Sequence, residues 1–304
     1  MSRNLEKIIC IVGQTATGKS DLAVALAKKY NGEIISADSR QVYRGLNIGS
    51  AKITKKEMKG VPHYLLDIAD PKKERYTAAD FASAAKSAAT NVISRGKNPI
   101  LCGGTGFYIE SFLHGNDLPN VPPNKKLRKQ LKKLSAEALW TKLRRLDSSR
   151  AKNIDPRNKV RVIRAIEIAT TLGKIPKQKV KNHYNALMIG LTLPPEKIKE
   201  KIHNRLVKRM RGNVLIKEIR NLHERGVSWK RLYDFGLEYR YVALYLQKKI
   251  SKEKMLSEIE KESYQYAKRQ MTWFKRDKKT KWFSPSEKSK IEKLVTIFID
   301  KKNR

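Results

Sequence analysis

Short apolar runs alternate with segments of helical spacing along the first 120 residues of the chain. Four of the apolar runs are typical of buried strands, at residues 8–12, 33–36, 64–68 and 99–102. Between them, 20–30 has its apolar residues at helical spacing, and 77–95 predicts a long Ala-rich helix with a capping box of Thr77 and Asp80. Strands that alternate with helices predict a doubly wound, parallel sheet of the α/β class.

The pattern changes after Gly115, where the Pro-rich stretch 118–123 is typical of a linker and basic helical segments follow. One helix is expected to begin at Asp155-Pro156. Its inner side is expected to carry Val160, Ile163, Ile166 and Ile168. Residues 186–193 return to a strand pattern. Helices are expected after that strand at about 195–211, 213–225, 238–247, 251–276 and 287–301.

The loop after the first strand fits the phosphate-binding pattern G-x-x-x-x-G-K-[ST] without a mismatch. Its residues are Gly13, Gln14, Thr15, Ala16, Thr17, Gly18, Lys19 and Ser20. The glycines let backbone N–H groups point at an anion, and the positive end of the next helix adds to that field. Lys19 supplies a mobile charge and Ser20 can bind Mg²⁺. The pattern leaves open a nucleoside triphosphate, any diphosphate, or an ordinary glycine-rich turn.

This motif and the strand pattern together predict a P-loop NTPase-like core that a helical insertion divides into two parts. The first part of the core is expected over 1–120, and a helical, basic insertion over 121–185. The last strand and the C-terminal helices are expected over 186–304. In the final long helix, Tyr266 and Trp273 are expected mainly in the core, with the cations on a solvated face.

Two further loops are expected at the same edge of the sheet as the phosphate loop, where ligands bind in open α/β sheets. The loop 38–41 contributes Asp38, which can ligate Mg²⁺, act as a general base, or only cap its own loop. The loop 103–106 contributes Thr105, whose hydroxyl can donate to a phosphate oxygen. A second acidic strand end, usual in phosphoryl transfer, is not evident, and this disfavours an ATPase.

The charge of the chain is extreme and uneven. The formal net charge is +38 over 304 residues, with an isoelectric point near 10.2. Residues 1–120 hold 17 Lys and Arg against 11 Asp and Glu, whereas the remainder holds 50 against 18. The surplus therefore lies downstream of the phosphate loop, which favours a nucleic-acid partner there over a generally Lys-rich composition.

The two cysteines and the N-terminal segment favour a cytoplasmic protein. Cys10 and Cys102 each lie in an expected strand, without the spacing of a metal site or a disulfide framework. Residues 1–7 carry charges and lead directly into the first strand, so no signal peptide is expected. No apolar run is long enough to span a membrane.

The chain resembles the tRNA dimethylallyltransferase (isopentenyltransferase) family over nearly its whole length. Three motifs in this order are the specific part of the resemblance: ADSRQVYRG, GGTGFY and AKRQMTW. The full set of matching stretches is 13–20, 35–45, 48–52, 61–67, 76–81, 99–108, 161–167 and 266–273.

The resemblance implies a reaction. A dimethylallyl group passes from dimethylallyl diphosphate to N6 of the adenosine on the 3′ side of the anticodon (position 37) of tRNA, and diphosphate leaves. Asp38 is implied as the general base. The leaving group is implied to be neutralised by the phosphate loop with Lys19, by Mg²⁺ near Ser20, by Thr105, and by Arg205 or Arg209, of which Arg205 is preferred.

No obligate protein partner is evident from the sequence, so a monomer is expected. The resemblance also implies how tRNA is bound. The target base is flipped into a channel near Asp38, Ser39, Arg40 and Gln41. The other implied tRNA contacts, in the basic insertion, are Arg128, Val160, Arg161, Val162, Ile163 and Arg164. The chain departs from the family pattern at Gln14, where Pro is common, and at Thr17, where Ser is common. Glu238 replaces a glycine and Tyr264 replaces an arginine.

Two other functions remain open from the residues alone. A P-loop kinase of small molecules or nucleotides would bind and turn over ATP, and it would have no need for the downstream positive charge. A non-catalytic RNA-binding protein with a relic phosphate loop would lose no activity when Asp38 is replaced by Asn.

Overall fold

The computed structural model describes residues 5–73, 75–115, 121–176 and 182–301. The chain divides into two compact units, and they are described separately below. The first unit joins Met1–Gly115 to Asn182–Arg304, and the second is Asn116–Lys181. The expected insertion, 121–185, differs from the second unit by a few residues at each end.

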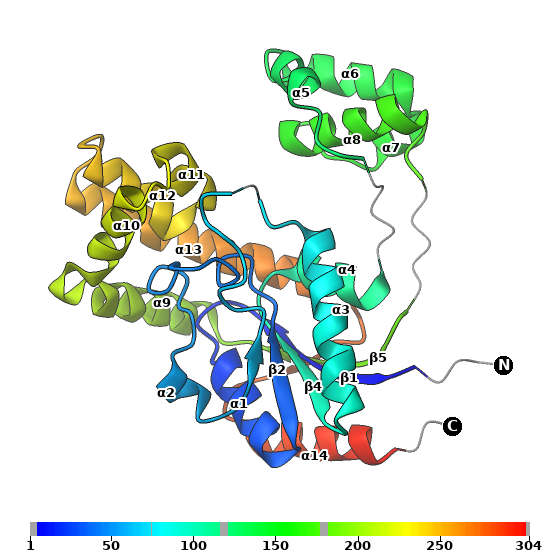
Figure 1. Ribbon diagram of the computed structural model, residues 1–304, viewed down its shortest axis with the longest axis vertical. Helices are drawn as coiled ribbons and strands as arrows, with labels where there is room; N and C mark the ends of the chain where they lie inside the picture. Colours follow the sequence, from blue (N-terminus) through cyan, green and yellow to red (C-terminus); the bar gives the residue numbers. More distant parts are fainter. Residues whose placement is uncertain (1–4, 74, 116–120, 177–181, 302–304) are drawn as a thin grey trace. The chain divides into compact units, whose positions relative to one another are not determined.

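The first unit is built on one sheet of six parallel strands, in the order β3-β2-β4-β1-β5-β6 (Figure 1). The strands are β1 (Lys7–Gly13), β2 (Gly32–Ser36), β3 (His63–Tyr64), β4 (Asn98–Cys102), β5 (Asn185–Leu191) and β6 (Lys281–Phe283). The expected α/β class, parallel sheet and returning fifth strand are confirmed. The pairing of β1 with β5 over seven residues joins the two halves of the core.

Two strands differ from expectation for local reasons. β3 ends at Tyr64 because Leu65 and Asp67 adopt left-handed backbone, with φ of 64° and 56°. β6 has only three residues between lysine-rich segments, so its sequence carries no strand period. It pairs with β5 where Gly190 leaves room for the Trp282 ring; a Cβ at Gly190 would lie 2.6 Å from that ring.

Helices cover both faces of the sheet, which is why its strands are almost continuously apolar. On one face, α1 (Lys19–Lys29) and α14 (Lys288–Asp300) pack against alternate residues of β1, β2, β4 and β5. The other face meets α3 (Ala78–Ser94) and α13 (Lys252–Phe274), and α4 (Gly106–His114) packs against both of these helices. Cys10 and Cys102 lie buried in this core, as predicted. The capping box of Thr77 and Asp80 is also confirmed.

The C-terminal helices lie beside the carboxyl edge of the sheet. They are α9 (Pro195–Met210), α10 (Val214–Glu224), α11 (Trp229–Phe235) and α12 (Leu237–Leu246). The structure also contains the single-turn α2 (Lys55–Met58). α11, which begins at the cap residue Ser228, is absent from the expected elements because it is only seven residues long. No helix in the described parts of the chain is long and apolar enough to cross a membrane.

Over residues 121–176, which the structure describes, the second unit has four helices and a small core of its own. They are α5 (Lys125–Leu131), α6 (Ala136–Leu146), α7 (Ser148–Lys152) and α8 (Lys159–Leu172), around Leu139, Leu143, Val162 and Ile166. α8 begins three residues later than expected, because Asn158 is its cap and Asp155 instead accepts from the N–H of Arg157. Val160 is 74% exposed, so its expected place on the inner side is wrong.

Glu33, at the start of β2, is a buried carboxylate whose contribution to the stability of the fold can be measured. Its carboxylate is buried and accepts hydrogen bonds from Arg95, Lys97 and Tyr64. The hydrogen bond from Arg95 and the other donors lower the pKa of Glu33 to about 2. The resulting stabilisation is present above the pKa of an unfolded glutamate and is lost as pH falls toward the folded value.

We therefore expect Glu33→Gln to reduce the free energy of unfolding by about 2 kcal/mol at neutral pH, measured by urea denaturation. The difference from the unmodified protein should shrink as pH falls to about 3.5. Glu292→Gln, which breaks an exposed pair with Lys29, is the control and should cost less than about 1 kcal/mol. Equal losses in both variants would contradict the role of the buried carboxylate.

Candidate active site

Three loops meet at the carboxyl edge of the sheet because they leave three neighbouring strands. Backbone hydrogen bonds join them: Gly103 N–H donates to Ile11 O at 3.1 Å, and Thr105 N–H donates to Ala37 O at 3.1 Å. The loops are the phosphate loop 13–20 after β1, residues 37–41 after β2 and residues 103–106 after β4. The structure thus brings together the loops that the sequence singled out.

The phosphate loop has the curled backbone that its glycines predict. Gly13 and Gly18 have φ of 130° and 84°, in the region that favours glycine. A Cβ on Gly13 would lie 2.3 Å from the carbonyl oxygen of Leu191, so β5 leaves no room for a side chain. Since α1 begins directly after Gly18, the loop ends at free helical N–H groups, which attract an anion.

Lys19 is held against the loop backbone, where Nζ donates to the carbonyl of Gln14 at 2.6 Å. Burial lowers the pKa of Lys19 to about 8; Cys102 and Asp38 act to raise it and Arg205 to lower it. An ammonium group that has already lost its water interacts more strongly with an arriving anion than an exposed one does. Lys19, Asp38 and Arg205 are therefore electrostatic neighbours.

Asp38 uses one carboxylate oxygen for its own loop. Oδ1 accepts from the backbone N–H groups of Arg40 at 2.8 Å and Gln41 at 3.2 Å. Oδ2 accepts no hydrogen bond from the described residues. The loop-capping role and the general-base role are thus compatible, because capping fixes the carboxylate while one oxygen remains available.

Thr105 links the second and third loops. Its Oγ1 accepts from the N–H of Ser39 at 3.0 Å, and its side chain also forms a hydrogen bond with Tyr266. Arg40 and Gln41 also hold the site together. Arg40 Nε donates to Phe235 O at 2.7 Å, and Gln41 Nε2 donates to Ala51 O at 3.2 Å.

The two candidate arginines of α9 have different surroundings. Arg209 is buried and forms an ion pair of 2.7 Å with Glu238 Oε1, and it also donates to Gly49 O. Arg205 has no ion pair or hydrogen bond with any residue in the described ranges. Burial, with the nearby charge of Arg209, lowers the pKa of Arg205 to about 10. Arg205 thus feels the charges of Glu238 and Asp38 but forms no ion pair with a described carboxylate.

One hollow of about 230 Å³, here called the central pocket, is lined by Asp38, Arg205 and Arg209, whereas Lys19 and Thr105 are not among its lining residues. Its walls come from the phosphate loop, the loop after β2, and helices α9, α11, α12 and α13. The residues that bear on its chemistry are Thr15, Asp38, Ser39, Arg205, Tyr266 and Arg269. A carboxylate therefore shares one cavity with the phosphate loop and an unpaired guanidinium.

Comparison with known proteins places this architecture in a family. The IPP transferase profile matches residues 41–277. A tRNA dimethylallyltransferase from Anoxybacillus flavithermus is 37% identical over 295 residues, which is 95% of this chain and 94% of that protein. The chain belongs to the IPP transferase family. The matched profile begins after the phosphate loop, so that motif supports the assignment independently.

Solved structures of this family have the same fold. The full-length tRNA isopentenylpyrophosphate transferase of Bacillus halodurans aligns with a TM-score of 0.74 and 35% identity, covering 97% of both chains. A eukaryotic dimethylallyltransferase, crystallised acting on tRNA, aligns with a TM-score of 0.83 and 25% identity. That alignment covers 97% of this chain and 79% of the other.

Several residues that shape this IPP transferase site had no assigned role from the sequence. Tyr266, expected mainly in the core, lines the central pocket, and burial together with Asp38 raises its pKa to about 12. Gln270 on the same helix contacts two of the three loops. Gln270 lies in the AKRQMTW motif and Tyr266 directly precedes it, so the sequence marked this part of the helix as important. The motif alone does not indicate which of its side chains face the loops.

Glu218 of α10 was also missed, because nothing near it in the sequence marks it. Its carboxylate accepts from three successive backbone N–H groups, of Asn47 at 3.0 Å, Ile48 at 2.6 Å and Gly49 at 3.0 Å. Tyr239 also donates to it. This carboxylate fixes the segment that contributes Gly49 to the central pocket.

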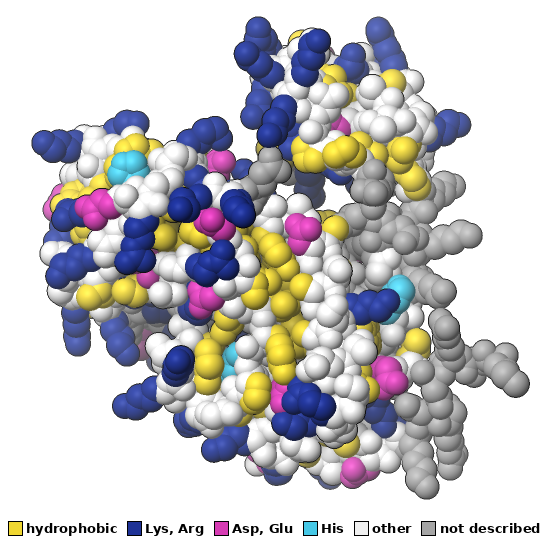
Figure 2. All heavy atoms as spheres, viewed as in Figure 1, with side chains coloured by type: hydrophobic (Ala, Val, Ile, Leu, Met, Phe, Trp, Pro, Cys, Tyr) yellow, Lys and Arg dark blue, Asp and Glu magenta, His cyan; other side chains and the backbone are white. Residues whose placement is uncertain are grey.

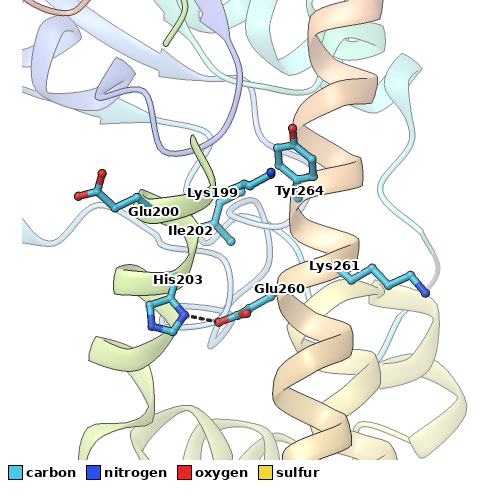
Figure 3. A pocket seen from close by; sticks show the side chains of 7 residues that line it. All are labelled: Lys199, Glu200, Ile202, His203, Glu260, Lys261 and Tyr264. Atoms are coloured by element: carbon cyan, nitrogen blue, oxygen red, sulfur yellow. Dashed lines mark hydrogen bonds and ion pairs between the residues drawn. The ribbon is translucent and has the colours of Figure 1, made fainter. Parts of the chain in front are cut away.

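Tyr264, the other departure from the expected family pattern, lies outside the central pocket. It lines a separate hollow of about 410 Å³ between α9 and α13. Figure 3 shows Lys199 reaching toward the Tyr264 ring, with the His203–Glu260 pair across the same hollow. Lys199 and Lys268 have their ammonium groups 5.4 and 4.8 Å from the ring centroid. Positive charge is thus retained around this position by lysines.

In the second unit, two expected tRNA contacts form a structural cluster. Arg128 makes two hydrogen bonds of 2.7 Å to Glu167, whose side chain is 1% exposed. Arg164 donates to the same carboxylate at 3.1 Å and to Val121 O at 2.8 Å. Both guanidinium groups remain about one-third exposed, so each also has a face toward solvent.

The residues of the expected tRNA-contact segment 160–164 lie on different faces of α8, some in the core and some at the surface. Val162 and Ile163 lie in the core of the unit, 0% and 6% exposed, so their side chains are turned away from solvent. Val160 and Arg161 are at the surface. Figure 2 shows Lys and Arg crowded over α5–α8 with hardly any Asp or Glu on the visible face.

The donor set fits a magnesium ion that is held partly by substrate. No group of three or more His, Cys, Asp or Glu that could hold a metal occurs among the residues the structure covers. Mg²⁺ in phosphate sites is typically held by one or two protein oxygens together with phosphates and water. The exposed Ser20 hydroxyl, which has no partner in the described chain, suits such a site.

Because Arg209 and Arg205 have different surroundings, we expect their replacement to change the free energy of unfolding by different amounts. Arg209→Met leaves Glu238 buried without its partner and is expected to cost about 3 kcal/mol of unfolding free energy. Arg205→Met removes a desolvated charge that has no partner in the described structure, and should cost less than about 1 kcal/mol. Urea denaturation of both variants measures the difference. A larger loss in Arg205→Met would contradict this assignment.

Proposed function

We propose that this chain transfers the dimethylallyl group of dimethylallyl diphosphate to N6 of adenosine 37 in tRNA. The observation that carries the proposal is the central pocket, where Asp38 keeps a free carboxylate oxygen near the phosphate loop and Arg205. The names of the relatives, tRNA dimethylallyltransferases, support the transfer of a dimethylallyl group to tRNA. A carboxylate is suited to taking a proton, and the cationic loop is suited to releasing a diphosphate.

The reaction breaks the bond between the allylic carbon and the diphosphate oxygen and forms a bond from that carbon to N6. Negative charge grows on the departing oxygen, so cations and N–H groups aimed at it accelerate the step. The N–H groups of the phosphate loop, Lys19 and Arg205 supply positive charge. Thr105 donates its hydroxyl proton to a phosphate oxygen while its Oγ1 stays bonded to Ser39.

The exocyclic amine of adenine is a weak nucleophile because its lone pair is delocalised into the ring. We assign Asp38 Oδ2 as the base that accepts the N6 proton, while Oδ1 keeps the carboxylate fixed through Arg40 and Gln41. Ser20 is the residue we assign to Mg²⁺. When bound there with the diphosphate, the ion would neutralise part of the charge of the leaving group.

The acceptor is a large polyanion, and the charge of the chain suits it. The target base must leave its stack to enter the central pocket. Arg161 and the surface lysines of the second unit are the cations we assign to the tRNA backbone, with the exposed faces of Arg128 and Arg164. We propose that the enzyme works as a monomer in the cytoplasm, where its tRNA substrate is found.

A transfer assay tests the function. The protein is incubated with Mg²⁺, labelled dimethylallyl diphosphate and unmodified tRNA, and the nucleosides are then separated. Label on the adenosine at position 37 is the expected result. Absence of label, together with ATP turnover under the same conditions, would instead favour the kinase.

Asp38→Asn tests the base. The amide oxygen can still accept from Arg40 and Gln41, so the loop should keep its shape while the proton acceptor is lost. We expect kcat to fall by about 10²–10⁴ with the Kd for tRNA unchanged. Asp300→Asn, at the exposed end of α14, is the control and should keep full activity. A parallel loss of tRNA affinity would make Asp38 a recognition residue.

A further inference from the structure

Helix α13 runs past the loops of the active site and turns one face toward them. Tyr266, Gln270 and Trp273 follow one another at helical spacing on this face. Tyr266 lines the central pocket, and Trp273 occupies the space over Gly106. Gln270 lies between the other two and is 5% exposed.

The Gln270 amide joins two loops through its two ends. Its Oε1 accepts from the backbone N–H of Thr15 in the phosphate loop at 2.7 Å. Its Nε2 donates to the carbonyl of Gly104, in the loop after β4, at 3.0 Å. A carboxamide has a donor and an acceptor at this spacing, which neither an apolar side chain nor an ionised carboxylate offers.

The loop after β4 is shaped to receive this face of α13. A Cβ on Gly104 would lie 2.1 Å from Gln270 Nε2, and a Cβ on Gly106 would lie 2.2 Å from the Trp273 ring. The two glycines therefore let the helix approach until the amide reaches both loops. The Gln270 amide therefore bridges the two loops: the loop after β4 lacks side chains where α13 approaches it, and the amide spans the remaining distance to Thr15.

The bridge has consequences for the groups next to it. Thr15 directly precedes Ala16, whose φ of 64° marks the tight part of the phosphate loop. Gly104 directly precedes Thr105, whose hydroxyl is assigned to the diphosphate. Holding Thr15 and Gly104 on one rigid amide therefore sets the separation between the N–H groups of the phosphate loop and the Thr105 hydroxyl.

We propose that Gln270 is a positioning residue for the diphosphate of the donor. It acts through Thr15 and Gly104 and does not touch the reacting atoms. The proposal rests on the proposed function in naming the donor, but its main observable is the binding of pyrophosphate, which needs neither tRNA nor transfer. A chain that binds pyrophosphate but does not prenylate tRNA would refute the function and still test Gln270.

The first test is Gln270→Met, which keeps the length of the side chain and removes its hydrogen bonds to Thr15, Gly104 and Tyr266. We expect the Kd for pyrophosphate with Mg²⁺, measured by calorimetry, and the KM for dimethylallyl diphosphate each to rise roughly tenfold. The KM for tRNA should not change. Gln265→Met, an exposed glutamine on the same helix, is the control and should change none of these values.

The second test is Gln270→Glu, which separates positioning from simple packing. A protonated carboxyl group can accept from Thr15 and donate to Gly104 as the amide does, whereas the ionised form has no donor. The pyrophosphate affinity of the variant, relative to the unmodified protein, should therefore be near normal at acidic pH and fall as pH rises.

Three outcomes would overturn the proposal. One is a normal pyrophosphate Kd in Gln270→Met with only a lower melting temperature, since this would make Gln270 a packing residue. Another is an equal loss of tRNA and pyrophosphate affinity, which would indicate general damage to the fold. The third is a pyrophosphate affinity of the Gln270→Glu variant that has the same ratio to the affinity of the unmodified protein at every pH.

Discussion

The close approach of three loops at the carboxyl edge of the sheet is the constraint on which the active site depends. The loop after β4 has almost no free space around its backbone: a Cβ on Gly103 would lie 2.2 Å from Ala37 O, and Gly104 and Gly106 are closed in by α13. Because these glycines let backbone meet backbone, Thr105 can hold Ser39, and Asp38 lies near the phosphate loop. The same lack of space lets a helix from the far end of the chain set the distance between two loops.

The cations at this site differ in whether they form an ion pair with a carboxylate of the protein. Arg209 is neutralised by Glu238, and both side chains are more than nine-tenths buried. Glu238, a departure from the expected family pattern, therefore has its partner in α9. Arg205 and Lys19 find no carboxylate partner among the described residues, and both have lowered pKa values because they are buried. Cations kept in this condition are ready to receive a diphosphate.

The second unit shows that a basic surface and a structural cluster can share residues. Glu167 holds Arg128 and Arg164 at the base of a small helical core while part of each guanidinium stays in solvent. Loss of either arginine therefore disturbs the unit as well as any RNA contact. A fall in tRNA affinity in such variants needs a stability measurement beside it. Arg161, which is exposed and makes no ion pair among the described residues, is the cleaner probe.

The sequence by itself determined the parallel α/β core, the phosphate loop, and the convergence of Asp38 and Thr105 on it, because strand periods and glycine loops are local and parallel strands place their carboxyl ends at one edge. It failed for β6 and α11, which are too short to carry a period, and for the start of α8, where Asn158 rather than Asp155 is the cap. Tertiary structure alone decided that Arg209 is paired and Arg205 is not, that Glu218 clamps residues 47–49, and that Gln270 bridges two loops. Arg209 and Glu238 are 29 positions apart, and the other contacts join residues 166 or more positions apart, so only the packing of α9, α10, α12 and α13 against the sheet edge determines which side chains meet.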